Sequence, residues 1–310
     1  MGLNLDGLSV YVKQNTEIQF QAIAGFKSAE YFKKIPMTGD SQAINILSFG
    51  TLGASLQPGG CGWNAQGSTY LTQRTISLDN IKYNEEICVE TLRDYYASET
   101  MNASSKGNEV LPFEQLFIDS KIKEIAKTND IISWMGNKLT GTGSYLALAN
   151  GIVAKLGTGS GAVLPNSTLG ITGSVTVANV ISVVDAVVNN IPEDISDRDD
   201  VKIFTSYANF RLYVQALKNA NLYNYSADNK DGKMYIGGSN VELVSVPGLA
   251  GTSNFIGTFA ENLVMGVGDV SDYQALDVFY SRDNRSVRAA MDYRLGFQVA
   301  YPTLVSWFKI

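Results

Sequence analysis

Apolar residues at helical spacing predict one long helix over residues 112–137. Its apolar stripe is formed by Ile118, Ile122, Ile125 and Ile132, with Phe113 and Phe117 starting a second row. Pro112 suits the first helical position, where a backbone N–H is not needed, and Gly136 followed by Asn137 is a stop signal. About 25 residues at about 1.5 Å each give a rod of roughly 40 Å. We interpret this helix either as an ordinary core helix or as the element around which two lobes are built.

A two-residue alternation near the C-terminus predicts a long antiparallel strand. Apolar residues occupy nearly every second position of residues 287–301, and mostly polar or small residues lie between them. We expect one buried face and a bend at Gly296. Residues 276–280 (LDVFY), before the turn SRDNRS, are the expected hairpin partner. Residues 74–96 predict another strand, which has one apolar face formed by Ile81, Tyr83, Ile87 and Val89.

Residues 38–74 are rich in glycine and carry little charge. Ile44, Ile46 and Tyr70 are possible strand positions on either side of the segment QPGGCGWNAQGS. The pattern predicts a long hairpin with a glycine-rich tip, and loops of this length without their own core are usually functional or disordered. Trp63 at the tip has two interpretations, which are a tucked indole on a surface loop and an anchor onto a neighbouring chain.

The segments on either side of the long helix contain weaker signals. Alternation at residues 17–22 indicates a short strand or an extended arm within residues 1–37. Residues 138–176 form a second glycine-rich zone, which we interpret as loops between two lobes. Thr176 is the expected cap of a helix that reaches Ile191 and ends before Pro192.

The following segment predicts a sheet with a covering helix. Val201–Thr205 reads as a short apolar strand, and Ser206 as the cap of the next helix. That helix directs four residues towards the sheet, namely Phe210, Tyr213, Val214 and Leu217. Strands at 241–246 and 263–267 then indicate an α+β or mixed sheet in this lobe.

Composition limits the classes of function. A chain of 310 residues favours two lobes, and 17% charged residues indicate a surface partly hidden in contacts. The net charge of −6, a pI of about 4.8 and the lack of a Lys/Arg cluster argue against nucleic-acid binding as the main task. No run of 18 apolar residues occurs, and the N-terminus lacks a basic segment followed by an apolar one. Neither membrane insertion nor secretion is supported.

The sequence also lacks the residues of common catalytic sites. Without histidine, a Ser–His–Asp site, a Cys–His site and a histidine-bound metal are all excluded. Cys61 and Cys88 are too few for a disulfide framework or a zinc site, and whether they lie together or stay reduced is open. Residues 157–161 (GTGSG) lack the Lys-Ser/Thr of a phosphate loop, and residues 228–232 (DNKDG) lack essential calcium ligands. The acidic loop PEDISDRDD has two interpretations, which are attraction of a cation and a solvated surface loop, and we favour the second. Its aspartates are Asp194, Asp197, Asp199 and Asp200. We therefore predict no catalytic, cofactor-binding or metal-binding residues.

The C-terminal third contains a recognisable series of segments. It runs VKIFTSYANFRLYVQALKNANLY, KMYIGGSNVELVSVPGL, ENLVMGVGD, LDVFYSRDN and MDYRLGFQVAYPTLVSWF. This series resembles the major capsid proteins of tailed phages, which have the Hong Kong 97-type fold. Upstream, an arm, a glycine-rich hairpin and a returning strand precede the long helix, as in that family. The resemblance covers nearly the whole chain, and it lies in the order and spacing of segments rather than in an invariant motif.

The resemblance implies an α+β capsid fold with five regions. These are an N-terminal arm (1–37), an extended β-hairpin called the E-loop (38–74), a peripheral domain with the spine helix (75–137), an axial domain (138–270) and peripheral return strands (271–310). The implied function is that of a major capsid protein, not an enzyme, which self-assembles as hexamers and pentamers into an icosahedral shell around the phage genome. The expected assembly contacts on the hairpin are Trp63, Tyr70 and Arg74.

Further expectations follow from the same resemblance. Scaffolding and portal proteins are the implied partners, and double-stranded DNA is enclosed without specific binding. No cofactor and no membrane contact are expected, and the protein would be found in the virion capsid after assembly in the host cytoplasm. Two departures from the family are visible. The chain begins almost directly at the arm, which implies a separate scaffolding protein or removal of a scaffolding segment. No lysine occurs between Lys34 and Lys82, so lysine cross-linking through the hairpin has no candidate.

Two alternatives stay open at the level of sequence. The first keeps the fold but changes the role to an encapsulin-like cellular compartment that holds a cargo enzyme. The second is a glycine-rich monomeric enzyme or binding module for a polar substrate. A shell subunit sediments as a large particle, whereas a binding module sediments as a small species at all salt and protein concentrations.

Overall fold

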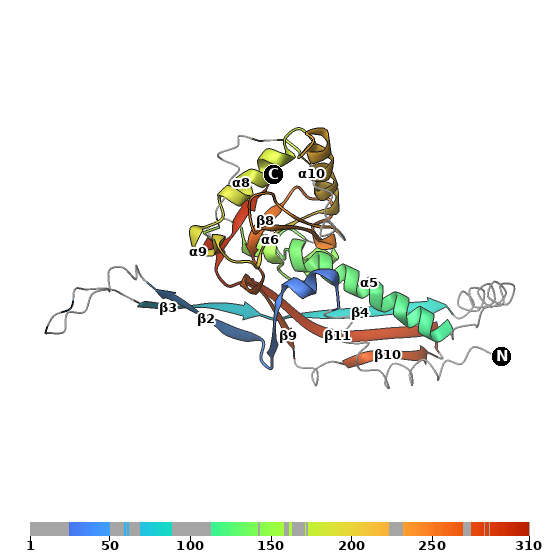
Figure 1. The fold of residues 1–310 in the computed structure, drawn as a ribbon. Coiled ribbons are helices and arrows are strands. Elements are labelled where there is room, and N and C mark those ends of the chain that lie inside the picture. The colour runs from blue at the N-terminus through green and yellow to red at the C-terminus, as the bar shows by residue number, and fades with distance from the viewer. Residues whose placement is uncertain are drawn as a thin grey trace.

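The computed structural model shows an elongated lobe, a compact lobe and a projecting hairpin (Figure 1). It describes residues 25–49, 59, 61, 69–88, 113–141, 143–157, 161–162, 171, 173–222, 232–268, 274–281, 283–284 and 286–309. The elongated lobe contains a long sheet and the helix α5 (Phe113–Met135), and the compact lobe contains α8 (Val180–Asn189) and α10 (Tyr207–Asn219). Helices and strands are thus combined, as the α+β prediction requires.

The strand β11 (Ser286–Val299) is the centre of the long sheet. One side of β11 pairs with β4 (Asp79–Cys88), and the other pairs with β10 (Gln274–Ser281) and then β9 (Leu263–Gly268), all antiparallel. The strand β1 (Lys33–Met37) joins the sheet parallel to β9. The predicted C-terminal hairpin is confirmed. Its register places Tyr293 opposite Ile81 and Val287 opposite Ile87, so the apolar positions of β11 and β4 lie on one face.

The helix α5 covers this apolar face (Figure 1). Ile122, Ile125 and Ile132 are buried against alternate residues of β11, which confirms most of the predicted stripe. The side chain of Ile118 lies outside the described part of the chain, as does Pro112. The helix ends at Met135, directly before the predicted stop signal of Gly136 and Asn137.

Residues 138–157 fold back on the end of α5, so their interpretation as loops between lobes is wrong for this part. They contain η2 (Tyr145–Ala147) and α6 (Ile152–Lys155), and the side chains of Ile152 and Leu156 are buried in the same core as α5. Gly136 permits the turn, because a Cβ there would lie 2.3 Å from the Ala149 carbonyl oxygen. The sequence pattern missed α6 because four residues are too few for a periodicity to show.

The compact lobe is built on a second five-stranded sheet. Its order is β12 (Ser306–Phe308), β8 (Phe255–Phe259), β5 (Val201–Thr205), β7 (Glu242–Ser245) and β6 (Lys233–Tyr235). Leu243 and Phe255 pack in one core with α8 and α10, whereas the next residues, Val244 and Ile256, pack in the core that contains α5. Both faces of the sheet are therefore buried, which explains why its strands read as continuous apolar runs.

Most local signals in this lobe are confirmed. The strand β5 has the predicted bounds, and Ser206 caps α10 by accepting a hydrogen bond from the Asn209 backbone N–H at 3.3 Å. Tyr213 of α10 is buried beneath the helix. The predicted cap at Thr176 is wrong, because α8 begins at Val180 and the residues between them form a turn.

Two strand predictions differ from the structure. Residues 263–267 were expected in the sheet of the second lobe but form β9 of the long sheet, because order along the chain does not fix which strands pair. Residues 74–96 were expected as one strand, but β3 (Thr69–Ser77) and β4 are separated at Leu78. The backbone N–H of Leu78 donates to the Asp40 carbonyl at 2.8 Å, and its side chain is buried. Residues 89–96 lie outside the described chain.

Short helices connect the longer elements of both lobes. They are η1 (Lys27–Tyr31), α9 (Glu193–Ser196), η3 (Pro247–Leu249), η4 (Ala260–Asn262) and η6 (Pro302–Leu304). Both η1 and η3 pack against α5. There the indole of Trp134 lies between the rings of Phe32 and Phe204, with ring centroids 5.6 and 5.2 Å away. Because Phe204 belongs to the compact lobe and Phe32 leads into the long sheet, one aromatic cluster joins both lobes.

Candidate assembly surface

The projecting hairpin is formed by β2 (Ser41–Phe49) and β3, which pair antiparallel from Ser41 opposite Ser77 to Phe49 opposite Thr69 (Figure 1). The hairpin prediction is confirmed over these strands, and most of the tip lies outside the described residues. Its root is held by an apolar cluster of Met37, Ile76, Leu78, Val264 and Ala300, against which Ile44 packs. Nine residues at about 3.3 Å each give each strand a reach of about 30 Å.

The described side chains of the hairpin beyond its root are mostly polar and carry little charge. Asn45 and Gln73 are exposed opposite each other, and Gln73 Nε2 donates to Asn45 Oδ1 at 3.0 Å. Neutral side chains of this kind lose less on desolvation than charged ones. The surface is therefore suited to burial against another protein surface without a matching set of charges.

The three predicted contact residues are only partly placed by the structure. Trp63 lies outside the described residues. Tyr70 is on β3 opposite Ser48, but its side chain is not described. Arg74 lies opposite Ile44, is half-buried, and burial lowers the pKa of its guanidinium. Tyr70 and Arg74 are four residues apart on one strand and so share a face, but their role in assembly stays a prediction.

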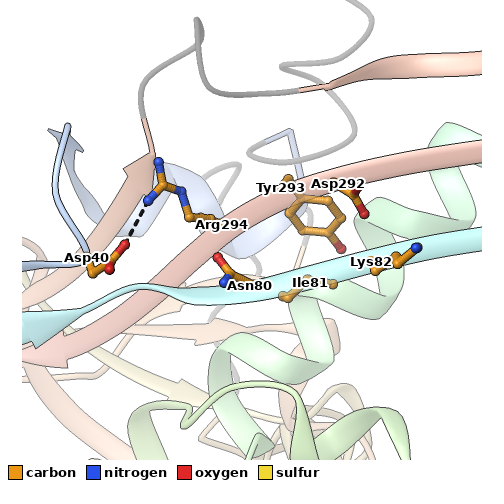
Figure 2. Close-up of a pocket in the computed structure, with 7 residues that line it drawn as sticks. All are labelled: Asp40, Asn80, Ile81, Lys82, Asp292, Tyr293 and Arg294. Atoms are coloured by element: carbon orange, nitrogen blue, oxygen red, sulfur yellow. Dashed lines mark hydrogen bonds and ion pairs between the residues drawn. The ribbon is translucent and has the colours of Figure 1, made fainter.

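The face of the long sheet opposite to α5 carries a polar pocket of about 490 Å³ (Figure 2). It is lined by Asp40, Asn80, Ile81, Lys82, Asp292, Tyr293 and Arg294. Figure 2 shows Arg294 directed at Asp40, and the guanidinium Nη1 lies 2.9 Å from the carboxylate. Since Asp40 immediately precedes β2, this ion pair links the sheet to the root of the hairpin.

A second pocket of about 530 Å³ continues along the same strands. It is lined by Lys82, Asn84, Glu85, Glu86, Phe279, Arg288, Ala289 and Ala290. Glu86 accepts hydrogen bonds from Ser286 and Asn284, and with the nearby Arg288 they lower the pKa of its carboxyl. Because Lys82 lines both pockets, the polar positions of β4 and β11 make one extended surface. The sequence predicts the alternation of each strand but not this shared surface. The alternation within one strand does not say which residues of the other strand lie opposite it.

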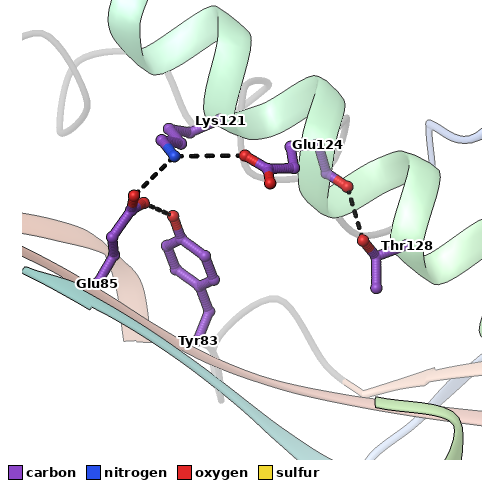
Figure 3. Close-up of polar contacts among 5 residues, drawn as sticks. All are labelled: Tyr83, Glu85, Lys121, Glu124 and Thr128. Atoms are coloured by element: carbon purple, nitrogen blue, oxygen red, sulfur yellow. Dashed lines mark hydrogen bonds and ion pairs between the residues drawn. The ribbon is translucent and has the colours of Figure 1, made fainter. Parts of the chain in front are cut away.

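An ion-pair network fixes α5 on the sheet near the same strands (Figure 3). Lys121 Nζ lies 2.7 Å from Glu85 Oε1 of β4 and 3.3 Å from Glu124 Oε2 of α5. Tyr83 donates its hydroxyl proton to Glu85, and burial together with this carboxylate raises the pKa of the phenol. Burial acts to lower the pKa of Lys121, but the two carboxylates outweigh it and the pKa is raised. The network positions the helix and offers no reactive group.

The residues considered for other chemistry do not converge. Cys61 and Cys88 are both free and exposed. Asp200 accepts from the guanidinium of Arg198 at 2.7 Å, and Asp199 accepts from Asn240 at 3.2 Å. Within the described ranges, no group of three or more His, Cys, Asp or Glu side chains is arranged to hold a metal. None of the described helices is long and apolar enough to cross a membrane.

No protein-family model and no curated protein matches the sequence significantly, but solved capsid structures match the fold. The procapsid of satellite phage P4, which includes the size determination protein, matches with a TM-score of 0.63 and 14% identity. The match covers 95% of this chain and 90% of that chain. The capsid of the native GTA particle matches with a TM-score of 0.60 and 12% identity, over 93% of this chain and 90% of that chain.

A virus-like particle from Pyrococcus furiosus matches as well, with a TM-score of 0.53 and 8% identity over 98% of both chains. At these identities the likeness concerns the fold, and it extends over nearly the full length of each chain. The chain has the fold of phage capsid proteins.

Proposed function

We propose that this chain is a major capsid protein that self-assembles into the icosahedral head shell of a phage and encloses its genome. The observation that carries the proposal is the likeness to capsid chains over 90% or more of both partners, at TM-scores of 0.60 and 0.63. The projecting hairpin supports it, since a shell subunit needs extensions that overlap its neighbours. Many modest contacts per subunit then act together. The role is structural, and we propose neither an enzymatic activity nor a cofactor.

We assign the parts of the chain as in the Hong Kong 97-type fold. The hairpin within residues 38–74 is the E-loop, α5 is the spine helix, and residues 1–37 are the N-terminal arm. The peripheral domain comprises residues 75–137 and 271–310, and the axial domain comprises 138–270. Two strands cross this division, because β9 joins the long sheet and β12 joins the compact sheet.

The proposed contacts follow from the shape of the subunit. The E-loop lies over a neighbouring copy. The polar face of β4 and β11 is the surface on which a neighbouring copy makes such contacts. Trp63, Tyr70 and Arg74 are the proposed contact residues on the hairpin. Copies form hexamers and pentamers, with scaffolding and portal proteins as partners, in the host cytoplasm. The net charge of −6 suits a shell that encloses double-stranded DNA without binding it tightly.

Electron microscopy and analysis of particle contents test the proposal. We expect the expressed chain to form closed shells, and shells from infected cells to contain DNA. A protein cargo in place of DNA would favour a cellular compartment, an alternative supported by the match to the Pyrococcus furiosus virus-like particle. Sedimentation as a small species under all conditions would contradict both, and would favour a monomeric enzyme or binding module.

We expect the shells to be held together without covalent links. No lysine occurs between Lys34 and Lys82, so the hairpin offers no amine for an isopeptide bond. Boiling assembled particles in detergent should release single chains of 33.6 kDa. The measurement is a denaturing gel, and a ladder of covalent multimers that survives reducing agent would show the expectation to be wrong.

A further inference from the structure

The contact of α5 with η1 holds an unusual set of buried polar atoms. Across the described ranges, four buried side-chain polar atoms have no partner in good hydrogen-bond geometry: Ser28 Oγ, Tyr31 Oη, Asp130 Oδ1 and Trp134 Nε1. Weaker polar contacts remain, since Ser28 lies beside the Asp130 carboxyl, and Lys233 and Glu30 lie beside the Tyr31 hydroxyl. Two belong to η1 and two to the last turns of α5. Buried polar groups in native proteins are nearly always paired, because an unpaired one carries its full desolvation cost. The contact of η1 with α5 therefore holds several buried polar groups that are only weakly paired.

Asp130 is the charged member of this set, and it contacts three elements. It lies on α5 and is only 2% exposed. On one side is η3, so close that a Cβ on Gly248 would lie 2.8 Å from Asp130 Oδ1. On another side is η1, whose fully buried Ser28 makes a polar contact with the carboxyl. The carboxyl therefore lies where the N-terminal segment, the long helix and the compact lobe meet.

No cation neutralises this carboxyl directly, as none of the ion pairs among the described residues includes Asp130. From η1, the charge that acts on it is Lys27, which is exposed and donates to the Tyr207 hydroxyl. Glu30 of η1 pairs with Lys233 instead. The other titratable groups that neighbouring elements turn towards α5 are Tyr31 on η1, Lys155 on α6, Tyr145 on η2, Tyr293 on β11, and Tyr83 and Glu85 on β4, where Glu85 pairs with Lys121. The helix η3 has none, and on α5 itself Lys127 lies one turn before Asp130.

Burial thus dominates the protonation of this group. It raises the pKa of Asp130 from 3.8 to about 6, against the smaller opposing effects of Ser28 and Lys27. In the closed junction the carboxyl is neutral below this pH, and in an opened junction it ionises above about 4. Opening therefore becomes easier as the pH rises from about 4 to about 6, and it changes little above that range.

We propose that Asp130 is a protonation-controlled latch that holds η1 and η3 against α5 at acidic pH and loosens them at neutral and alkaline pH. The latch matters because η1 also joins the compact lobe. The ring of Tyr31 stacks edge-on against Phe204 at 5.3 Å, and Glu30 reaches Lys233 of β6. Ionisation of this one carboxyl then loosens η1 and weakens the packing of the compact lobe against α5. The latch is a property of the single chain and does not rest on the proposed shell function.

Hydrogen–deuterium exchange of the full chain tests the latch. Exchange is measured at pH 5 and pH 8 and expressed as protection factors, which remove the intrinsic effect of pH on exchange. In the wild-type chain we expect protection of the η1 amides to fall about tenfold from pH 5 to pH 8. Protection in β2 and β3 should stay constant, because hairpin fraying does not involve Asp130. In Asp130→Asn, which mimics the neutral carboxyl, the η1 protection should be independent of pH.

The matched control is Asp119→Asn, an exposed aspartate on the same helix. This variant should keep the wild-type fall in η1 protection. If Asp130→Asn does not fold, the test rests on the wild-type chain, in which the pH dependence of the η1 protection factors is compared with that of β2 and β3. A wild-type protection factor that is flat across this range would overturn the latch, and so would a fall that persists in Asp130→Asn or disappears in Asp119→Asn.

Discussion

Replacing residues 46–72 by the dipeptide Asn-Gly is expected to abolish particle formation and to leave the chain folded. The cut keeps Asn45 opposite Gln73, and Asn-Gly is the preferred two-residue turn of an antiparallel hairpin. The root cluster around Ile76 and Leu78 stays intact, so the body loses none of its described core. What is lost is the part of the hairpin that we propose to lie over neighbouring copies. Electron microscopy and sedimentation of the variant measure the outcome, with circular dichroism as the check on folding.

A variant that leaves the hairpin at full length serves as the control. Gly59 is exposed, and a Cβ there would meet no atom within 4 Å, so Gly59→Ala should form particles like the wild-type chain. Normal particles from the shortened chain would show that the hairpin does not hold the shell together. Loss of particles in Gly59→Ala would instead point to the tip segment as the sensitive element.

Replacing Gly248 by alanine is expected to cause a large loss of stability, although it adds a single carbon atom. The added Cβ would lie 2.2 Å from Trp134 Cδ1 and 2.3 Å from the Asp130 carbonyl oxygen. The second of these atoms is helix backbone, and the first is part of a fully buried indole held by Phe32 and Phe204. Neither can move without separating η3 from α5. Because overpacking of a rigid core costs about 1–3 kcal/mol and sometimes more, we expect a loss of about 3 kcal/mol in the free energy of unfolding.

Urea unfolding of the unassembled chain measures this loss, and Gly237→Ala is its control. A Cβ on Gly237 meets no atom within 4 Å, so that variant should change stability by less than about 0.5 kcal/mol. Equal midpoints for Gly248→Ala and Gly237→Ala would mean that η3 does not approach α5 as closely as described.

Local periodicity explains what could be predicted at the candidate surface. The hairpin strands around Ile44 and Tyr70 were found from alternation and glycine content, and the structure confirms them as β2 and β3. The polar surface shared by β4 and β11 was not found, although Lys82 and Arg294 both stand at polar positions of alternating strands. Whether two such rows form one surface depends on register, and register depends on pairing between residues that are about 200 positions apart.

Elements whose pattern is set by the geometry of one segment could be predicted from the sequence. These are the long helix with its buried Ile122, Ile125 and Ile132, the alternating strand β11, the strand β5 and the cap at Ser206. A helix or strand imposes its own period on the residues it buries, so such elements can be predicted from a short window. The order of these elements was also enough to indicate the capsid fold.

How these elements meet is visible only in the folded structure. It placed β9 in the long sheet rather than beside β5, it put Gly248 against α5, and it buried Asp130 without a cation. None of these features produces a periodic pattern in the sequence, because each arises where segments distant in sequence come into contact. Asp130 reads as one more polar residue of an amphipathic helix, and only its contacts with η1 and η3 give it an altered pKa.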